Sequence, residues 1–171
     1  GYQLEAGSYA TSYIPTYGTS VTRNVDRNLL STIPVDTSNN YTIFMDFVRI
    51  SDNEHTTKWF DLRGNGDTYI QFYMISGGGR LRVFFKGDAD ASAQTITDNN
   101  NPQKDEQYKL ALVRTDSSIK LFANGALIQT QTDKIPDELD YYAEWNENRI
   151  NNHMLFPTAL TDQEAIDLTT T

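Results

Sequence analysis

Two predicted strands, residues 68–76 and 80–86, alternate apolar side chains with tyrosine, glutamine and arginine. Because successive side chains of a strand point to opposite faces, the apolar residues turn to a core and the others gather on one outer face. Sugar C–H faces pack on aromatic rings, while arginine and amide groups bind hydroxyls directionally. The sequence therefore predicts a carbohydrate-binding face, completed by the neighbouring strand. Its members are Trp59, Arg63, Tyr69, Gln71, Tyr73, Arg80 and Arg82.

A second group of aromatic and amide residues lies in the acidic segment 133–148 and just after it. We predict a loop here, where such side chains can form the rim of a sugar site. The members are Tyr141, Tyr142, Trp145, Asn146 and Arg149. Both groups also have a plainer interpretation. The first is then the solvated cover of a sheet or a contact with a neighbouring module, and in the second Trp145 caps the edge of the core.

The sequence offers few residues for metal or nucleophilic chemistry. It has no cysteine, which excludes thiolate zinc sites, iron–sulfur clusters, cysteine nucleophiles and disulfides. Of its two histidines, His55 is predicted in a loop and His153 as a structural residue in a strand. Asp88 and Asp90 are weak candidates for a calcium site, whereas an EF-hand-type loop from Asp61 fails because its third position is a cation. We therefore expect no metal and no cofactor, with calcium as the alternative.

Charge and length narrow the class of partner. Lysine and arginine number 14 and aspartate and glutamate 23, so the formal net charge is −9. An acidic surface repels phosphate backbones and anionic lipids, which argues against nucleic acid as a partner. No apolar run approaches the roughly 18 residues of a membrane span, so no membrane insertion is expected. With Gly first and no visible signal peptide, we expect the 171 residues to be a mature fragment or an excised domain.

Short strands and tight turns dominate the predicted elements. Residues 41–50 (YTIFMDFVRI) are apolar on both faces, which predicts a buried central strand. Asn124-Gly125 is the strongest hairpin signal, because a type I′ turn needs positive φ at both positions. Thr161 and Glu164 form a capping box that begins a short helical turn. We predict an all-β fold, a two-sheet antiparallel β-sandwich with one short C-terminal helical turn.

Three stretches, in this order, resemble parts of one known family. YTIFMDFVRI is similar to its opening core strand, YKLALVRTDSSIKLFANGALIQTQ to its paired hairpins, and RINNHMLFPTALTDQEAIDL to its closing strand and helical turn. The chain thus resembles the concanavalin A-like lectin/glucanase superfamily in its laminin-G-like form. The resemblance implies a jelly-roll sandwich over residues 24–171. The sandwich follows an extended leading segment, residues 1–23, which we expect to be a linker or an edge strand.

The leading segment carries a further resemblance. QLEAGSYATSYIPTYGTSVTR is similar to a stretch that precedes such modules in phage tail and other virion proteins. This implies a virion or an extracellular, cell-surface location, neighbouring modules in the same protein, and a part in host adhesion. The chain departs from legume-lectin-like members in showing no calcium-ligand cluster.

Enzymes also occur in this superfamily. Hydrolase members of the superfamily that the chain resembles carry their carboxylates on one strand as ExDxE or ExDxxE. The nearest match in this sequence runs from Glu138 to Glu144, and its last glutamate comes one residue later than the longer motif requires. In an extended strand those two residues lie about 20 Å apart, whereas retaining glycosidases need about 5–5.5 Å. Lyase members use a Gln-Ile-His strand, but residues 69–72 (YIQF) contain no histidine.

We therefore expect a non-catalytic, lectin-like module that binds a cell-surface or environmental polysaccharide. Two alternatives stay open. The first is a structural or protein-interaction module of a virion, and the second is a glycoside hydrolase or polysaccharide lyase of the same fold.

Overall fold

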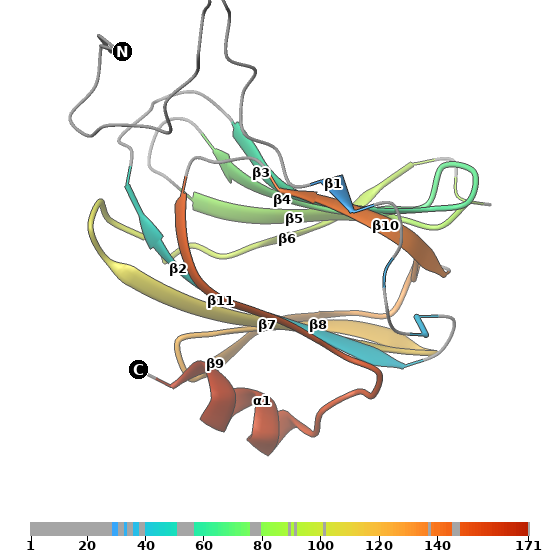
Figure 1. Ribbon diagram of the computed structural model, residues 1–171. Helices are drawn as coiled ribbons and strands as arrows, with labels where there is room; N and C mark the ends of the chain where they lie inside the picture. The colour runs from blue at the N-terminus through green and yellow to red at the C-terminus, as the bar shows by residue number, and fades with distance from the viewer. Residues whose placement is uncertain are drawn as a thin grey trace, which may run out of the picture.

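Two antiparallel β-sheets lie face to face in the computed structural model, and a helix lies beneath the second sheet (Figure 1). The structure describes residues 29–30, 33, 36–37, 40–50, 57–75, 80–88, 90, 92–100, 102–136, 138–144 and 148–170. The six-stranded sheet has the order β1 (Leu29–Leu30), β10 (Leu139–Glu144), β3 (Thr57–Gly64), β4 (Tyr69–Ile75), β5 (Arg80–Lys86), β6 (Gln94–Thr97). The five-stranded sheet has the order β11 (Asn148–Phe156), β2 (Tyr41–Arg49), β7 (Gln107–Thr115), β8 (Ser118–Ala123), β9 (Ala126–Gln131). The predicted two-sheet sandwich is confirmed.

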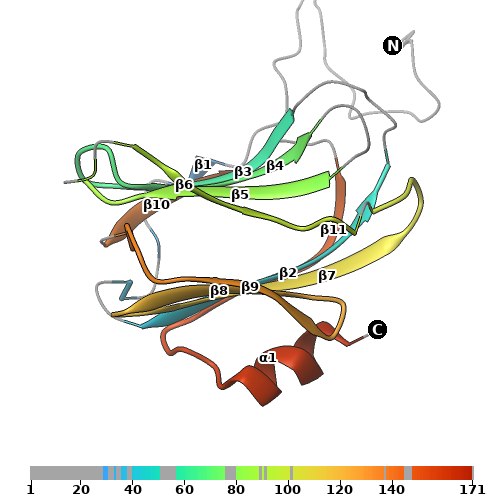
Figure 2. The same ribbon diagram turned by 180° about the vertical axis from the view of Figure 1, so that it is seen from behind.

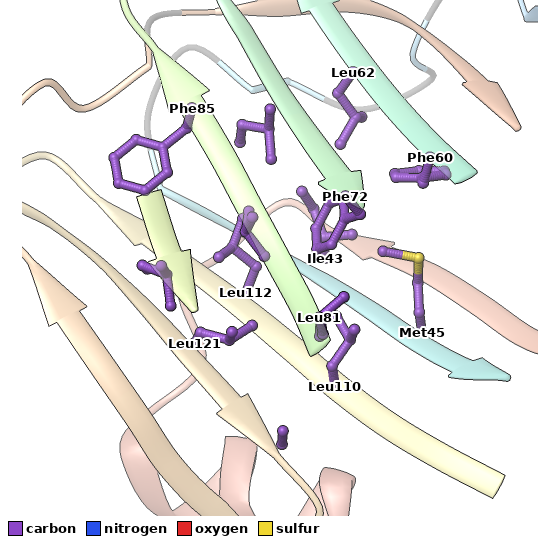
Figure 3. Packing of buried hydrophobic residues seen from close by; sticks show 14 of the residues in the cluster. Ile43, Met45, Phe60, Leu62, Phe72, Leu81, Phe85, Leu110, Leu112 and Leu121 are labelled. Atoms are coloured by element: carbon purple, nitrogen blue, oxygen red, sulfur yellow. The ribbon is translucent and has the colours of Figure 1, made fainter. Parts of the chain in front are cut away.

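The inner faces of the two sheets share one apolar core (Figure 3). Every second residue of β2, β4, β5, β7 and β8 enters it, as the period of two in the sequence predicts. The rings of Phe60 and Phe72 meet there edge to face, with their centroids 5.6 Å apart. From β3, β4 and β5 the core takes Phe60, Leu62, Ile70, Phe72, Met74, Leu81, Val83 and Phe85. The intervening residues of these three strands therefore point away from the core.

Strand β2 is the central strand that the apolar sequence YTIFMDFVRI predicts. It pairs with β11 on one side and with β7 on the other. Ile43, Met45 and Phe47 are buried in the core, while Phe44 and Val48 are buried on the opposite face of the sheet. Burial on both faces requires a further layer outside the five-stranded sheet.

The helix α1 (Asp162–Thr169) supplies that layer, as Figure 2 shows from behind. The predicted capping box begins it: the Glu164 amide donates to the Thr161 hydroxyl, and the Glu164 carboxylate accepts from the Thr161 amide. Ala165 of α1 packs in a second apolar cluster with Phe44, Ala111, Val113 and Phe122. This helix has eight residues, and the described part of the chain contains no helix long and apolar enough to span a membrane.

The Asn124-Gly125 turn joins β8 to β9 with φ angles of 44° and 78°, as a type I′ hairpin requires. The Asn124 side-chain oxygen accepts from the Lys109 amide at 2.9 Å. The Gly125 amide donates to the Thr169 hydroxyl at 3.1 Å. The turn is thus fastened both to the neighbouring strand and to the end of α1.

The prediction of a loop over residues 133–148 is wrong for its second half. Residues Leu139–Glu144 form β10, which pairs with β3 in the six-stranded sheet. The hydroxyl of Thr37 also bridges the backbone of Leu139, accepting from its amide and donating to its carbonyl. The strand is held by such distant partners rather than by an apolar pattern of its own. The predicted leading segment, residues 1–23, lies outside the described residues.

Candidate functional site

The outward positions of β3, β4 and β5 form a continuous surface, because the three strands are paired in register. Asp61 lies opposite Gln71, which lies opposite Phe84. Tyr69 lies between Arg63 and Lys86, and Tyr73 lies opposite Arg82. The β3–β5 face consists of Asp61, Arg63, Tyr69, Gln71, Tyr73, Arg80, Arg82, Phe84 and Lys86. Six of the seven predicted site residues are thereby brought together on one surface, with Arg80 at its end.

A ring pair occupies one row of the β3–β5 face. The rings of Tyr73 and Phe84 meet edge to face, with centroids 5.1 Å apart and planes at 74°. The Tyr73 hydroxyl donates to the side-chain oxygen of Gln71 at 3.2 Å. Gln71 is 7% exposed, so the amide and the phenol hold one another in place. The result is a fixed aromatic surface with hydrogen-bonding groups beside it.

Two guanidinium groups flank these rings in different ways. Arg63 Nε donates to the Asp61 carboxylate at 3.0 Å, and its guanidinium lies 5.1 Å from the centroid of the Tyr69 ring. Arg82 lies 5.8 Å from the centroid of the Phe84 ring, a cation–π distance. Its Nε is buried and has no hydrogen-bond partner among the described residues. Arg63 is therefore held by a carboxylate, whereas Arg82 lies only against a ring.

An ion pair closes the surface at the β3–β4 turn. Lys86 Nζ lies 2.5 Å from the Asp67 carboxylate. The hydrogen bond from Lys86 holds the pKa of Asp67 below its usual range, and the same bond raises the pKa of Lys86. Both side chains thus stay charged near neutral pH.

The weak calcium candidates lie just after β5, where Asp88 contacts the β3–β4 turn, and both have structural partners. Asp88 Oδ1 accepts from the Asp67 amide at 2.8 Å, and Asp90 Oδ2 accepts from the Gly87 amide at 3.0 Å. A Cβ on Gly66, whose φ is +63°, would lie 1.9 Å from the Asp88 carboxylate, so the turn also needs this glycine. Within the described ranges, no three metal-binding side chains are grouped as a metal site needs.

The second predicted group is divided between the two sheets. Tyr141 and Tyr142 belong to β10, where Tyr141 pairs with Arg63. Arg149 belongs to β11 in the other sheet, where it is exposed and pairs with Val48. The side chains of Tyr141 and Tyr142, and all of Trp145 and Asn146, lie outside the described residues.

Trp59 belongs to β3, at a register irregularity between Lys58 and Phe60, and its side chain is also outside the described part. Phe84 and Lys86 lie on the β3–β5 face but are absent from the predicted site. The sequence pattern indicates them, because they continue the alternation of Arg80 and Arg82 along one strand. His153, predicted to be structural, packs its ring edge to face on Phe60 with centroids 4.8 Å apart.

Comparison with known proteins points to one superfamily. A family model described as the concanavalin A-like lectin/glucanases superfamily matches residues 22–164. No curated protein matches the chain.

Several solved structures resemble the fold at low sequence identity. The CBM40 module of a Ruminococcus gnavus IT-sialidase, bound to alpha2,3 sialyllactose, is 18% identical with a TM-score of 0.64, over 85% of this chain and 97% of that one. Domain 4 of AbnA, an arabinanase from Geobacillus stearothermophilus in complex with arabinotriose, is 16% identical with a TM-score of 0.62, over 80% and 70%. A SAP-like pentraxin from Limulus polyphemus is 14% identical with a TM-score of 0.63, over 84% and 74%. At these identities the likeness is one of fold.

Proposed function

The chain belongs to the concanavalin A-like lectin/glucanases superfamily, and on this premise we propose that it is a non-catalytic carbohydrate-binding module that holds its glycan on the β3–β5 face. The observation that carries the proposal is the Tyr73–Phe84 ring pair with Gln71 and Arg82 beside it. Rings of this kind take the C–H face of a sugar, and flanking amide and guanidinium groups take its hydroxyls.

The internal contacts of the β3–β5 face favour binding because they limit the entropy that ordering a site costs. Gln71 is held by the Tyr73 hydroxyl, and Arg63 is held by Asp61. Arg63 keeps further N–H donors for a ligand, since a guanidinium carries five, while Gln71, which is 7% exposed, serves mainly to position Tyr73. A partly exposed sheet surface of this type favours weak single-site binding that repetition of the module strengthens through avidity.

The solved relatives of similar fold support a glycan as the ligand class. The Ruminococcus gnavus module is bound to sialyllactose, and the Geobacillus stearothermophilus domain is in complex with arabinotriose. Both are parts of larger enzymes that act on glycans by name, a sialidase and an arabinanase. We extend the ligand class, and not the individual sugar, to this chain.

The carboxylates near the β3–β5 face support binding rather than cleavage. Asp61 accepts from Arg63, and Asp67 from Lys86. A glycosidase acid must keep its proton near neutral pH, through a raised pKa. The pKa of Asp67 is instead lowered by Lys86. In the nearest sequence match to a hydrolase motif, Glu138 comes directly before β10 and Glu144 ends it, and an extended chain of this length spans about 20 Å.

A glycan array followed by calorimetry tests the proposal. We expect the chain to bind a defined set of glycans and Tyr73→Ala to weaken the best of them about tenfold, because the ring surface is lost. Tyr73→Phe keeps the ring and removes the hydroxyl with its bond to Gln71, so its loss of affinity should be smaller. Arg149→Gln, on the other sheet, should leave the affinity unchanged. Binding of no glycan, or a loss confined to Arg149→Gln, would contradict the proposal.

The phage or virion setting is a further part of the proposal and depends on the likeness of residues 3–23 to segments of phage tail proteins. These residues lie outside the described part of the chain. In that setting many copies of the module would act together on a host surface. A streptavidin tetramer of the biotinylated module should then bind cells bearing the array-selected glycan far more tightly than the monomer, and equal binding would argue against the multivalent role.

A further inference from the structure

The four cations of the β3–β5 face fall into two kinds. Arg63 and Lys86 each contact a carboxylate, Asp61 and Asp67 respectively. Arg80 and Arg82 have no acidic partner among the described residues, and they lie two residues apart on the same side of β5. On a chain with a net charge of −9, this leaves two guanidinium groups uncompensated on one small area.

Arg82 is also incompletely satisfied in its present conformation. Its Nε is buried, with no acceptor in the described part of the chain, while the side chain as a whole is partly exposed. A buried N–H without an acceptor is unfavourable, and the contact with the Phe84 ring supplies no acceptor. Rotation about the outer side-chain bonds would turn the Nε–Nη edge from the ring toward a ligand.

The chemistry that suits this edge is a carboxylate. The two parallel N–H groups of a guanidinium edge match the two oxygens of a planar carboxylate, and such a pair is stronger than a neutral hydrogen bond. Tyr73 and Thr97 lie opposite Arg82 on the neighbouring strands, so the rings and a hydroxyl surround the position. A sugar ring stacked on Tyr73 and Phe84 would bring a carboxylate substituent within reach of Arg82, with Arg80 adding charge.

We propose that the β3–β5 face selects acidic sugars, and that Arg82, supported by Arg80, binds the carboxylate of a uronic or sialic acid residue. This inference depends on the proposed function, because it specifies the ligand class of the same face. Arg63 and Lys86, already paired, position the surface and contribute less to the selection.

Calorimetry with paired probes tests the inference. The probes are trigalacturonic acid and α2,3-sialyllactose, each beside its carboxyl-reduced form, and together they distinguish the two sources of the carboxylate. We expect the native chain to bind at least one acid about tenfold or more tightly than its reduced form. Raising the salt concentration should weaken binding of the acid and leave that of the reduced form unchanged.

Variants then assign the effect to Arg82. Arg82→Gln should remove most of the preference for the acid while changing affinity for the reduced form less than about twofold. Arg82→Lys keeps the charge without the planar edge and should lose part of the preference, which provides a second variant if the first does not fold. Lys120→Gln changes the net charge equally on the other sheet and should retain the preference.

The outcomes separate the two proposals. Equal affinity for acid and reduced forms in the native chain would overturn the acidic-sugar inference and leave the carbohydrate-binding function standing. Preference for a sulfated probe over both acids would also overturn it. Binding of no glycan in the array would overturn both.

Discussion

The outer faces of the two sheets differ in the side chains that they carry and in what covers them. The five-stranded sheet presents Phe44, Ala111, Val113 and Phe122, and α1 covers them. The six-stranded sheet presents rings, amides and charges in the β3–β5 face, and no described helix lies over it. Both sheets arise from the same alternation along their strands, so the outward residues alone decide which face α1 covers and which presents polar and aromatic side chains.

The largest expected effect is the difference in stability lost when a ring is removed beneath α1 and when one is removed from the β3–β5 face. Phe122→Ala empties a fully buried position beneath α1 and should lower the free energy of unfolding by about 3–5 kcal/mol. Phe84→Ala, on the partly exposed β3–β5 face, should cost less than half as much. Urea denaturation of both variants measures the difference. Equal losses would mean that the β3–β5 face is itself a packing surface.

A smaller effect tests whether the sealing helix is independent of the open face. Thr161→Ala removes the side-chain acceptor of the capping box and should destabilise the chain by about 1 kcal/mol, read from the urea midpoint. Glycan affinity should remain within about twofold of the native value, because α1 lies on the far sheet. A parallel loss of affinity would show that the two faces are coupled.

The smallest expected effect is on the pH dependence of stability, and its direction differs between two carboxylates. Glu164 accepts from the Thr161 amide and hydroxyl, which lowers its pKa below the ordinary 4.5. Its contribution to stability is therefore present above pH 4.5 and is lost as the pH falls through the lower value of the folded state. Glu164→Gln should reduce the fall in Tm that the native chain shows in that acid range.

Asp98 provides the opposite control. Burial raises its pKa above the ordinary 3.8, so its charged form is disfavoured in the folded state, and stability is lost as the pH rises through the raised value. Asp98→Asn should remove this loss and raise Tm near neutral pH. Near neutral pH, Glu164→Gln should lower Tm and Asp98→Asn should raise it. Shifts of the same sign would contradict these assignments.

The sequence predicts most of the sandwich because its strands carry local signals. The apolar alternation of β4 and β5, the Asn124-Gly125 turn and the capping box at Thr161 each specify a local structure without reference to distant partners. Strand β10 gives no such signal. Its pairing with β3 joins residues far apart in the chain, and its acidic and aromatic sequence has no clear period.

The candidate site is predictable to the same extent and for the same reason. The alternation of β4 and β5 predicts that Tyr69, Gln71, Tyr73 and Arg82 share one face, and the same alternation accounts for Phe84, which the predicted site omits. Which cations are compensated could not be predicted, because the Lys86–Asp67 contact depends on the path of a turn. The separation of Arg149 from Tyr141 likewise depends on the sheet to which each strand is assigned.

The position of residue 170, directly after α1, has a practical consequence. The carbonyl of this residue accepts from Lys109 Nζ of β7 at 2.7 Å, and α1 lies on the opposite side of the sandwich from β3, β4 and β5 (Figures 1 and 2). A biotin or a resin linker attached at that point would orient the immobilised module with the β3–β5 face toward the solution. A sensor chip prepared in this way should retain full capacity, whereas random coupling through lysines would block a share of the molecules at Lys86.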